Sequence, residues 1–307
     1  MIRTSDEMMR NPAASLRAIL DKGRYVRRLC AYFQRRRSER HWLATGDIEP
    51  RIRDVLASPD LARIPKAGAA GQLRDGVLTM HNGLLVHAGS YSGDAMTRLL
   101  TRTGGVHEPQ EEVVFAALLK SIAAGSAMLE LGAWWGFYSM WFQSEVERAR
   151  NILVEPEMAN IDFGRRNFEL NGMSGEFLRR AAGATTSRGV DPPVFAVDDL
   201  LDELGIERLA ILHADIQGAE HEMLRGAANS LAARRIDWLF LSTHTHALHF
   251  ACRDLLAAHG YRVPETADLL DTYSYDGLLV ASAAAPPFAL AIAAKSGHNR
   301  ASSWLRI

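Results

Sequence analysis

The sequence predicts an α/β protein built on a mostly parallel, doubly wound sheet. The apolar run in Ala127–Tyr138 breaks into glycines at positions 132 and 136, which indicates a buried parallel strand and a tight turn into a helix. A second apolar run, Asn151–Val154, is followed by the carboxylate of Glu155. Later strands alternate with helices, and two closing strands end the pattern. This order predicts an open sheet with helices on both faces.

The first 60 residues are expected to be mostly helical and are locally basic. Positions 1–50 carry 11 Lys or Arg against 6 Asp or Glu, a local charge of +5. The segment Arg24–Arg37 mixes arginines with aromatic residues, which could contact RNA or an acidic substrate. Its apolar residues lie near helical spacing, however. We therefore favour a helix that packs on the main domain or on a second copy in a homodimer.

Over the whole chain 35 Lys and Arg balance 36 Asp and Glu, so no global charge attracts nucleic acid or an anionic membrane. No run approaches 18 apolar residues, and the N-terminus lacks the apolar core of a signal peptide. Cys30 and Cys252 lie far apart and form neither a zinc set nor a disulfide framework. We expect a cytoplasmic protein with a small-molecule partner and no membrane partner.

A β-hairpin and a helix are predicted before the first buried strand. Two apolar runs in Val77–His87 meet at Asn82-Gly83, a dipeptide that accepts the positive φ angles of a two-residue turn. The helix Asp94–Arg102 follows, where an active-site lid could be built. We expect residues 1–105 to serve as a lid or in oligomerisation, residues 106–285 to form the main domain, and residues 286–307 to form a tail.

The next predicted helix is Pro109–Ala123. Pro109 near its first position and acids in its first turn suit the exposed amides and the helix dipole. That structural role accounts for Glu108, Glu111 and Glu112. It does not account for His107, which enters the helix where the glycine turn is expected and is therefore a candidate site residue.

The remaining elements follow from apolar runs, glycines and caps. The helix expected after strand Phe195–Val197 should begin with Asp199 as its N-cap. In order, we expect helix Asn160–Asn171, strands Glu176–Gly183 and Phe195–Val197, a helix from Asp198, strand Leu209–Asp215, helix Ala219–Ala233, strand Ile236–Ser242, a helix near His249–His259, and closing strands Tyr261–Val263 and Asp276–Ser282.

The glycine turn and the acid after the second strand suit a nucleoside. A dinucleotide requires G-x-G-x-x-G, because its pyrophosphate must approach the helix closely. Here Trp134 and Trp135 occupy the turn, and no P-loop is present. The turn therefore favours an amino-acid nucleoside such as S-adenosylmethionine, with Glu130 near its ammonium group and Glu155 on its ribose hydroxyls.

Several motifs carry a resemblance to one family. LELGAWWGFYS, VEP, NFELNG, VDDLL and HADIQGAEHEMLRGA occur in this order within residues 105–282. Together they resemble the FkbM-type S-adenosylmethionine-dependent methyltransferases. The resemblance implies a class I methyltransferase fold with a Rossmann-like sheet. It also implies O-methylation of sugars, polyketides or other small hydroxylated metabolites.

Transferred position by position, the resemblance implies that Gly132, Gly136 and Glu130 line the methionine end of the cofactor. Asp215 would lie beside the reacting methyl group. Two positions depart from the family pattern: Trp134 replaces a small polar residue, and Gln217 replaces a common glutamate. The full set of expected cofactor contacts is Glu130, Gly132, Ala133, Trp135, Gly136, Tyr138, Ser139, Glu155, Pro156 and Asp215.

Methyl transfer from a sulfonium needs positioning and removal of the acceptor's proton. We expect the general base to be Asp215, His244 or His107, while His213 is expected to be a core residue. His244, His246 and His249 form an H-x-H-x-x-H pattern that could bind a divalent metal together with Asp215. One base among polar loop residues is favoured over a metal set.

Two other functions remain open from the sequence. An RNA or protein methyltransferase would use the basic N-terminal segment to hold its substrate. A non-catalytic scaffold would keep the fold and use the N-terminal helices for assembly.

Overall fold

The computed structural model describes residues 45, 47–286 and 291–295 of the 307. The chain divides into two units, Met1–Asp47 and Ile48–Ile307, and nearly all of the first unit lies outside the described residues. The basic segment Arg24–Arg37 and most of the predicted tail therefore lie outside them too. No helix among the described residues is long and apolar enough to cross a membrane.

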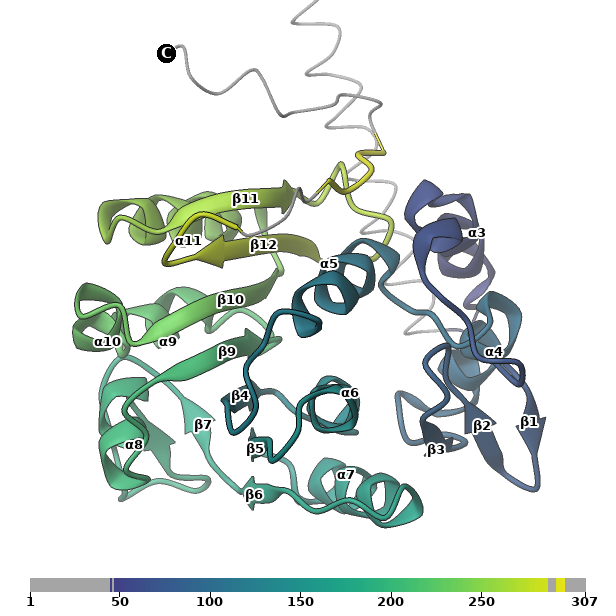
Figure 1. Ribbon diagram of the computed structural model, residues 1–307, viewed down its shortest axis with the longest axis horizontal. Helices are drawn as coiled ribbons and strands as arrows, with labels where there is room; N and C mark the ends of the chain where they lie inside the picture. Colours follow the sequence, from purple (N-terminus) through teal and green to yellow (C-terminus); the bar gives the residue numbers. More distant parts are fainter. Residues whose placement is uncertain (1–44, 46, 287–290, 296–307) are drawn as a thin grey trace, which may run out of the picture. The chain divides into compact units, whose positions relative to one another are not determined.

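A seven-stranded sheet with the order β11-β12-β10-β9-β4-β5-β6 forms the centre of the second unit (Figure 1). β12 runs antiparallel to both β10 and β11, whereas the pairs among β10, β9, β4, β5 and β6 are parallel. The mostly parallel, doubly wound sheet predicted from the sequence is confirmed. The strands are β4 (Ala127–Leu131), β5 (Arg150–Val154), β6 (Glu176–Leu178), β9 (Leu209–Ala214), β10 (Ile236–Thr243), β11 (Arg262–Ala267) and β12 (Gly277–Ser282).

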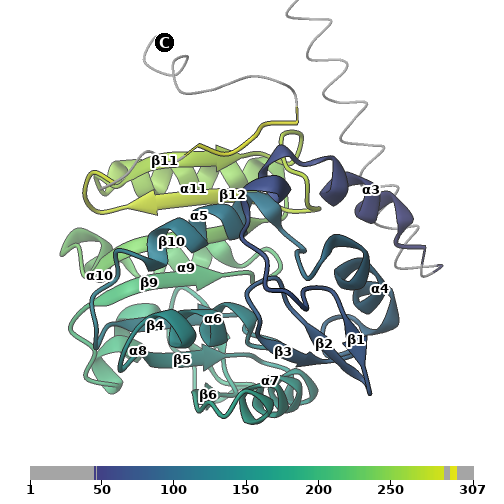
Figure 2. The same ribbon diagram turned by 45° about the vertical axis from the view of Figure 1, so that its right-hand side comes forward.

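Helices cover both faces of this sheet (Figures 1 and 2). One face carries α8 (Val197–Glu203), α9 (Glu220–Arg225), α10 (Ala228–Ala232) and α11 (His246–Ala258). The other carries α5 (Pro109–Leu119), α6 (Phe137–Glu145) and α7 (Met158–Leu170). The N-terminal elements of the unit are α3 (Glu49–Ala57), the 3-10 helix η1 (Pro59–Arg63) and α4 (Gly93–Thr103).

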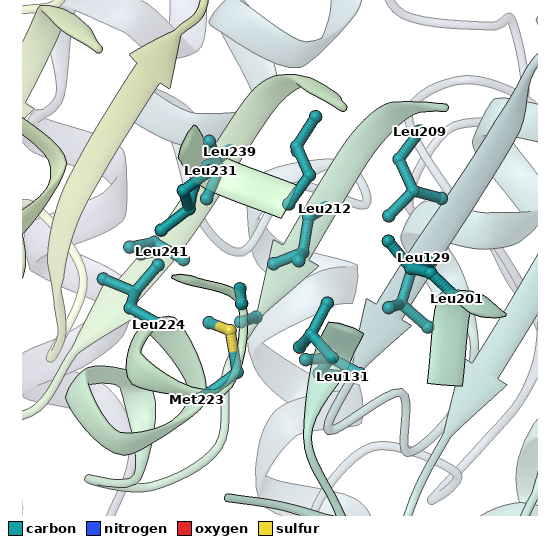
Figure 3. Close-up of a cluster of buried hydrophobic side chains, with 14 of the residues drawn as sticks. Leu129, Leu131, Leu201, Leu209, Leu212, Met223, Leu224, Leu231, Leu239 and Leu241 are labelled. Carbon is teal, nitrogen blue, oxygen red and sulfur yellow. The ribbon is translucent and has the colours of Figure 1, made fainter. Parts of the chain in front are cut away.

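The main hydrophobic core lies between the sheet and the first of these helical layers. Side chains alternate along a strand, so Leu129 and Leu131 of β4 point into this core while Glu130 between them points to the opposite face. Figure 3 shows these leucines packed beside leucines of β9 and β10 and beside Met223 and Leu224 of α9. This burial explains why the central strands are almost continuously apolar in sequence.

The predicted hairpin is confirmed, but its two-residue turn is wrong. β2 (Val77–Thr79) and β3 (Leu85–His87) pair antiparallel, and β1 (Leu73–Arg74) adds a third strand. Met80 N donates to Leu84 O at 2.8 Å, so the turn holds three residues. Among them only Gly83 has a positive φ, of 89°. A three-residue hairpin loop needs one left-handed residue rather than two.

Two asparagine side chains, one in α7 and one directly after it, fix the hairpin to this helix. Asn167 Oδ1 accepts from His87 N at 2.9 Å. Asn171 accepts from Leu85 N at 2.9 Å and donates to Leu85 O at 2.7 Å. These amide groups bond the backbone N–H and C=O groups of β3, as a neighbouring strand would.

Three other predicted elements differ in detail. The helix expected over Ala219–Ala233 is split into α9 and α10 at Gly226, where a Cβ would lie 2.2 Å from Gly183 O. The strand expected over Glu176–Gly183 is divided between β6 and the short strand β7 (Ala181–Ala182), which pairs with β8 (Val194–Phe195).

Asp199 is not the N-cap of α8. That position belongs to Ala196, and the Asp199 carboxylate instead accepts from the hydroxyl of Thr186. Its neighbour Asp198 accepts from Ser230 N at 2.8 Å and so caps α10 rather than its own helix.

The ends of three neighbouring strands are tied together by backbone hydrogen bonds. Gly132 N and Ala133 N both donate to Val154 O, at 2.9 and 3.1 Å, and Asp215 N donates to Leu131 O at 3.0 Å. Gly132 has a φ of 72°, and a Cβ there would lie 1.9 Å from Asp215 O. Only glycine fits this position, because both the backbone angle and the space exclude a side chain.

We predict that Gly132→Ala lowers the free energy of unfolding by at least about 3 kcal/mol, since strain and a backbone clash add. Gly205→Ala is the matched control: its φ is +61° but no atom lies within 4 Å of its Cβ position. The control should cost only about 1 kcal/mol. Urea unfolding of both variants checks this, and equal losses would contradict the close approach.

Candidate functional site

Glu155 stands at the carboxyl end of β5, where the sequence predicts a ribose ligand. Its Oε1 accepts from Glu157 N at 2.9 Å and from Asn160 Nδ2 at 3.2 Å, and its Oε2 accepts from Trp134 N at 3.2 Å. The side chain is buried, and burial raises the pKa of its carboxyl. These bonds fix the carboxylate against the glycine turn, with Pro156 directly after it.

Glu130 lies one strand over, inside β4, and its carboxylate is used by the protein itself. Its Oε2 accepts from Ser139 N at 2.9 Å, in the first turn of α6. The carboxylate thus satisfies one of the amides that a helix start leaves open. Burial raises the pKa of Glu130. Glu130 and Ser139 are both expected to contact the cofactor, and the structure shows them bonded to each other.

Aromatic rings line the glycine turn. Trp134 takes a left-handed φ of 41°, and its indole Nε1 is buried without a hydrogen-bond partner. Tyr91 stacks on Trp135, with ring centres 4.6 Å apart and planes at 8°, and meets Trp134 edge-on at 5.4 Å. Tyr91 comes from the segment between the hairpin and α4, so that segment covers the turn.

His107 lies under the same rings and is enclosed by carboxylates. Its Nδ1 is 2.7 Å from Glu112 Oε1, and its Nε2 is 3.6 Å from Glu108 Oε2. His81 of the hairpin approaches the other oxygen of Glu112 at 3.1 Å. His107 is only 2% exposed and Glu112 is fully buried. The acids at the start of α5 therefore do more than complement a helix dipole, because they form buried pairs with histidines.

A second buried pair joins α5 to the sheet. His213 of β9 lies with its Nε2 2.7 Å from Glu111 Oε1, and the ring of Tyr138 packs 4.2 Å from its own. Burial raises the pKa of Glu111 and lowers that of His213. This environment agrees with the core role expected for His213. Tyr138, expected at the cofactor, donates its hydroxyl to Glu108 at 3.2 Å.

Asp215 and His244, at the ends of β9 and β10, lie side by side. His244 Nε2 is 3.2 Å from Asp215 Oδ1 and 3.5 Å from Asp276 Oδ1, while its Nδ1 bonds Glu220 Oε1 at 2.9 Å. Burial alone would lower the pKa of His244, but the three carboxylates raise it to about 11. Burial would raise the pKa of Asp215, yet His244 lowers it.

The other two histidines of the H-x-H-x-x-H pattern do not join this cluster. His249 bonds Thr243 Oγ1 at 2.8 Å and Thr266 Oγ1 at 2.9 Å, and His246 stacks on Phe250 along α11. His246 and His249 therefore do not belong to a metal set with Asp215, the less favoured of the two interpretations of the pattern. α11 begins at His246, so the chain turns away from the strand end directly after His244.

Three residues of the site were not predicted from the sequence. Glu220 is the last residue of the Asp-x-x-Gly-Ala-Glu motif, so the motif itself carried a signal. Asp276 precedes the antiparallel strand β12, which returns it to the same edge. Arg51 of α3 reaches Glu108 at 3.7 Å and lies over the ring of Tyr275. No local sequence motif identifies Asp276 or Arg51 as a residue of the site.

The residues present fit an adenosyl methyl donor. Glu155 offers a fixed carboxylate for ribose hydroxyls, and the indole Nε1 of Trp134 is a buried donor without a hydrogen-bond partner. The side chain of Asp215 is 28% exposed beside Gly132. The donor, when bound, supplies a sulfonium with an electrophilic methyl group.

A comparison with known protein families matches part of the chain. Residues 139–263 match the family described as the methyltransferase FkbM domain. The resemblance predicted from the sequence is confirmed, and it supports a methyltransferase that depends on S-adenosylmethionine. No curated protein matches the chain significantly.

Solved structures with similar folds include other methyltransferases. Precorrin-6y C5,15-methyltransferase from Geobacter metallireducens is 15% identical, with a TM-score of 0.38 over 55% of this chain and 87% of that one. TrmK from M. capricolum, solved with S-adenosylhomocysteine, is 10% identical, with a TM-score of 0.39 over 55% of this chain and 67% of that one. Similarity of this size does not specify a substrate.

We predict that Glu112→Gln destabilises the protein by about 3 kcal/mol near neutral pH, because it breaks a buried pairing with two histidines. Burial would raise the pKa of Glu112, but the charges of His107 and His81 lower it far below its usual range. A carboxyl group whose pKa is lowered on folding stabilises the folded state at every pH above its pKa in the unfolded chain, about 4.3. That contribution is lost progressively as the pH falls below this value.

Urea unfolding between pH 3 and pH 6 measures this difference. The gap between wild type and Glu112→Gln should narrow progressively as pH falls below about 4. The exposed Glu169→Gln on α7 is the control and should leave the profile unchanged. A gap independent of pH would contradict the ionised pairing.

Proposed function

We propose that this protein transfers the methyl group of S-adenosylmethionine to a hydroxyl oxygen of a small metabolite. The observation that carries the proposal is the contact between Gly132 and Asp215 at the carboxyl edge of the sheet. A Cβ at Gly132 would lie 1.9 Å from Asp215 O, so the turn expected to hold the donor adjoins the residue expected to receive the acceptor. In an open α/β sheet, ligands bind at this edge.

Glu155 and the turn would hold the donor. The carboxylate is fixed by Trp134 N, Glu157 N and Asn160 Nδ2, so it needs no reordering to accept ribose hydroxyls. The small turn residues Gly132, Ala133 and Gly136 keep the backbone accessible to the methionyl part. Trp134 and Tyr91 would close the crevice from the side of the hairpin.

Asp215 is the proposed proton acceptor, because its side chain is the more exposed of the pair, at 28% against 12% for His244. His244 positions it, and Glu220 in turn positions His244 through Nδ1. General bases act by position as well as by pKa, and sulfonium transfer depends mainly on an in-line approach. His107 has a structural role in this proposal, since rings and carboxylates enclose it.

A small acceptor suits the aromatic and acidic surroundings of Asp215. Tyr91 and Trp134 offer aromatic surface, and Asp276 offers a further hydrogen-bond acceptor beside His244. Incubation with a panel of hydroxylated acceptors, with release of S-adenosylhomocysteine as readout, tests the reaction. Product with amines but with no hydroxyl would overturn O-methylation.

Glu155→Ala should weaken binding of S-adenosylhomocysteine by about 10- to 100-fold, the effect of losing hydrogen bonds to a charged group. Calorimetry measures the affinity, and circular dichroism checks that the fold survives. Glu157→Ala is the matched control, because Glu157 contributes its backbone N–H to Glu155 rather than its side chain. Equal affinities in wild type and Glu155→Ala would refute the assignment.

A further inference from the structure

Three possible metal ligands lie together after β9, after β10 and just before β12. His244 Nε2 lies 3.2 Å from Asp215 Oδ1 and 3.5 Å from Asp276 Oδ1. Despite these neighbours, Nε2 has no hydrogen-bond partner of good geometry. The ring nitrogen is therefore flanked by two carboxylate oxygens without a well-formed hydrogen bond to either.

Glu220 fixes which nitrogen of His244 faces these two carboxylates. Its Oε1 accepts from Ile216 N at 3.3 Å and Gly218 N at 3.2 Å and bonds His244 Nδ1 at 2.9 Å. Glu220 is fully buried, so this carboxylate is held in place. A carboxylate on one ring nitrogen that leaves the other for a metal is the usual outer arrangement of a histidine ligand.

We propose that His244 Nε2, Asp215 and Asp276 bind a divalent transition-metal ion, with Glu220 as the outer carboxylate. Asp215 Oδ1 and Asp276 Oδ1 both lie within 3.5 Å of His244 Nε2, close enough for small shifts to bring the three donor atoms around one ion. One imidazole with two carboxylates favours Mn²⁺ or Zn²⁺ over Mg²⁺, which prefers oxygen ligands alone.

The charge of the cluster favours a cation. Three carboxylates surround the ring of His244, and an ion bound to Nε2 would replace the proton on that nitrogen. Asp215, Asp276 and His244 remain 28%, 19% and 12% exposed, so an ion there would keep positions open for water or an acceptor oxygen. Catalytic metal sites leave such positions open, whereas structural sites are closed.

This inference rests on the proposed function and supplies the means of ionising the acceptor. An acceptor hydroxyl bound to the ion loses its proton to water. Its oxygen lone pair then forms a bond to the methyl carbon while the C–S bond breaks and leaves its electron pair on sulfur. The products are a methyl ether, S-adenosylhomocysteine and one proton. Asp215 then holds the ion rather than the proton.

The test uses full-length protein without a histidine tag, stripped of metal by chelator and titrated with MnCl₂ and with ZnCl₂. Calorimetry, and paramagnetic resonance for Mn²⁺, should show one ion per chain. Asp215→Asn and Asp276→Asn should each weaken binding at least tenfold, and Glu220→Gln should weaken it about 10- to 100-fold, as loss of an outer carboxylate does. The exposed Asp254→Asn of α11 is the control and should bind as wild type does.

Binding of S-adenosylhomocysteine to the same proteins separates this inference from the proposed function. If wild type binds the nucleoside but neither ion, the metal site is refuted and the methyltransferase stands. Ion binding that survives in both Asp variants also refutes it. If the nucleoside does not bind at all, the proposed function fails, whatever the ions do.

Discussion

The site depends on how closely the carboxyl ends of β5, β4 and β9 approach one another. Two amides, of Gly132 and Ala133, share the carbonyl of Val154, and the amide of Asp215 reaches the carbonyl of Leu131. No side chain fits at Gly132, because Asp215 O occupies the place of its Cβ. This constraint places Glu155 on one side of the turn and Asp215 on the other, so the backbone bonds that join the strand ends also set how these two carboxylates are placed.

A buried polar layer between α5, α6 and the sheet supports that edge. Glu111 pairs with His213, Glu112 lies between two histidines, and Glu130 holds the start of α6. Buried charges are expensive unless each has a partner, and here carboxylates and imidazoles provide one for another. Burial raises the pKa of Glu108 to about 8, which keeps it mostly protonated beside the site. The carboxyl groups of this layer are therefore paired with imidazoles, bonded to an amide or protonated, so the layer carries little unbalanced charge.

The periodic parts of the sequence predicted the fold well, because strands and helices repeat with fixed periods. Gly132, Glu155 and Asp215 were found in this way, since each follows an apolar run and so must lie at one edge. Local geometry was harder to predict: the turn at Gly83 and the break at Gly226 depend on contacts with distant segments. Asp276 could not be linked to Asp215 from the sequence, because the antiparallel return of β12 alone brings them together.

A crystal structure with S-adenosylhomocysteine tests the central claim most directly. The account predicts both ribose hydroxyls within about 3 Å of the Glu155 carboxylate, with the sulfur facing Asp215. Density for the ligand elsewhere, with the crevice between Gly132 and Glu155 empty, would contradict it.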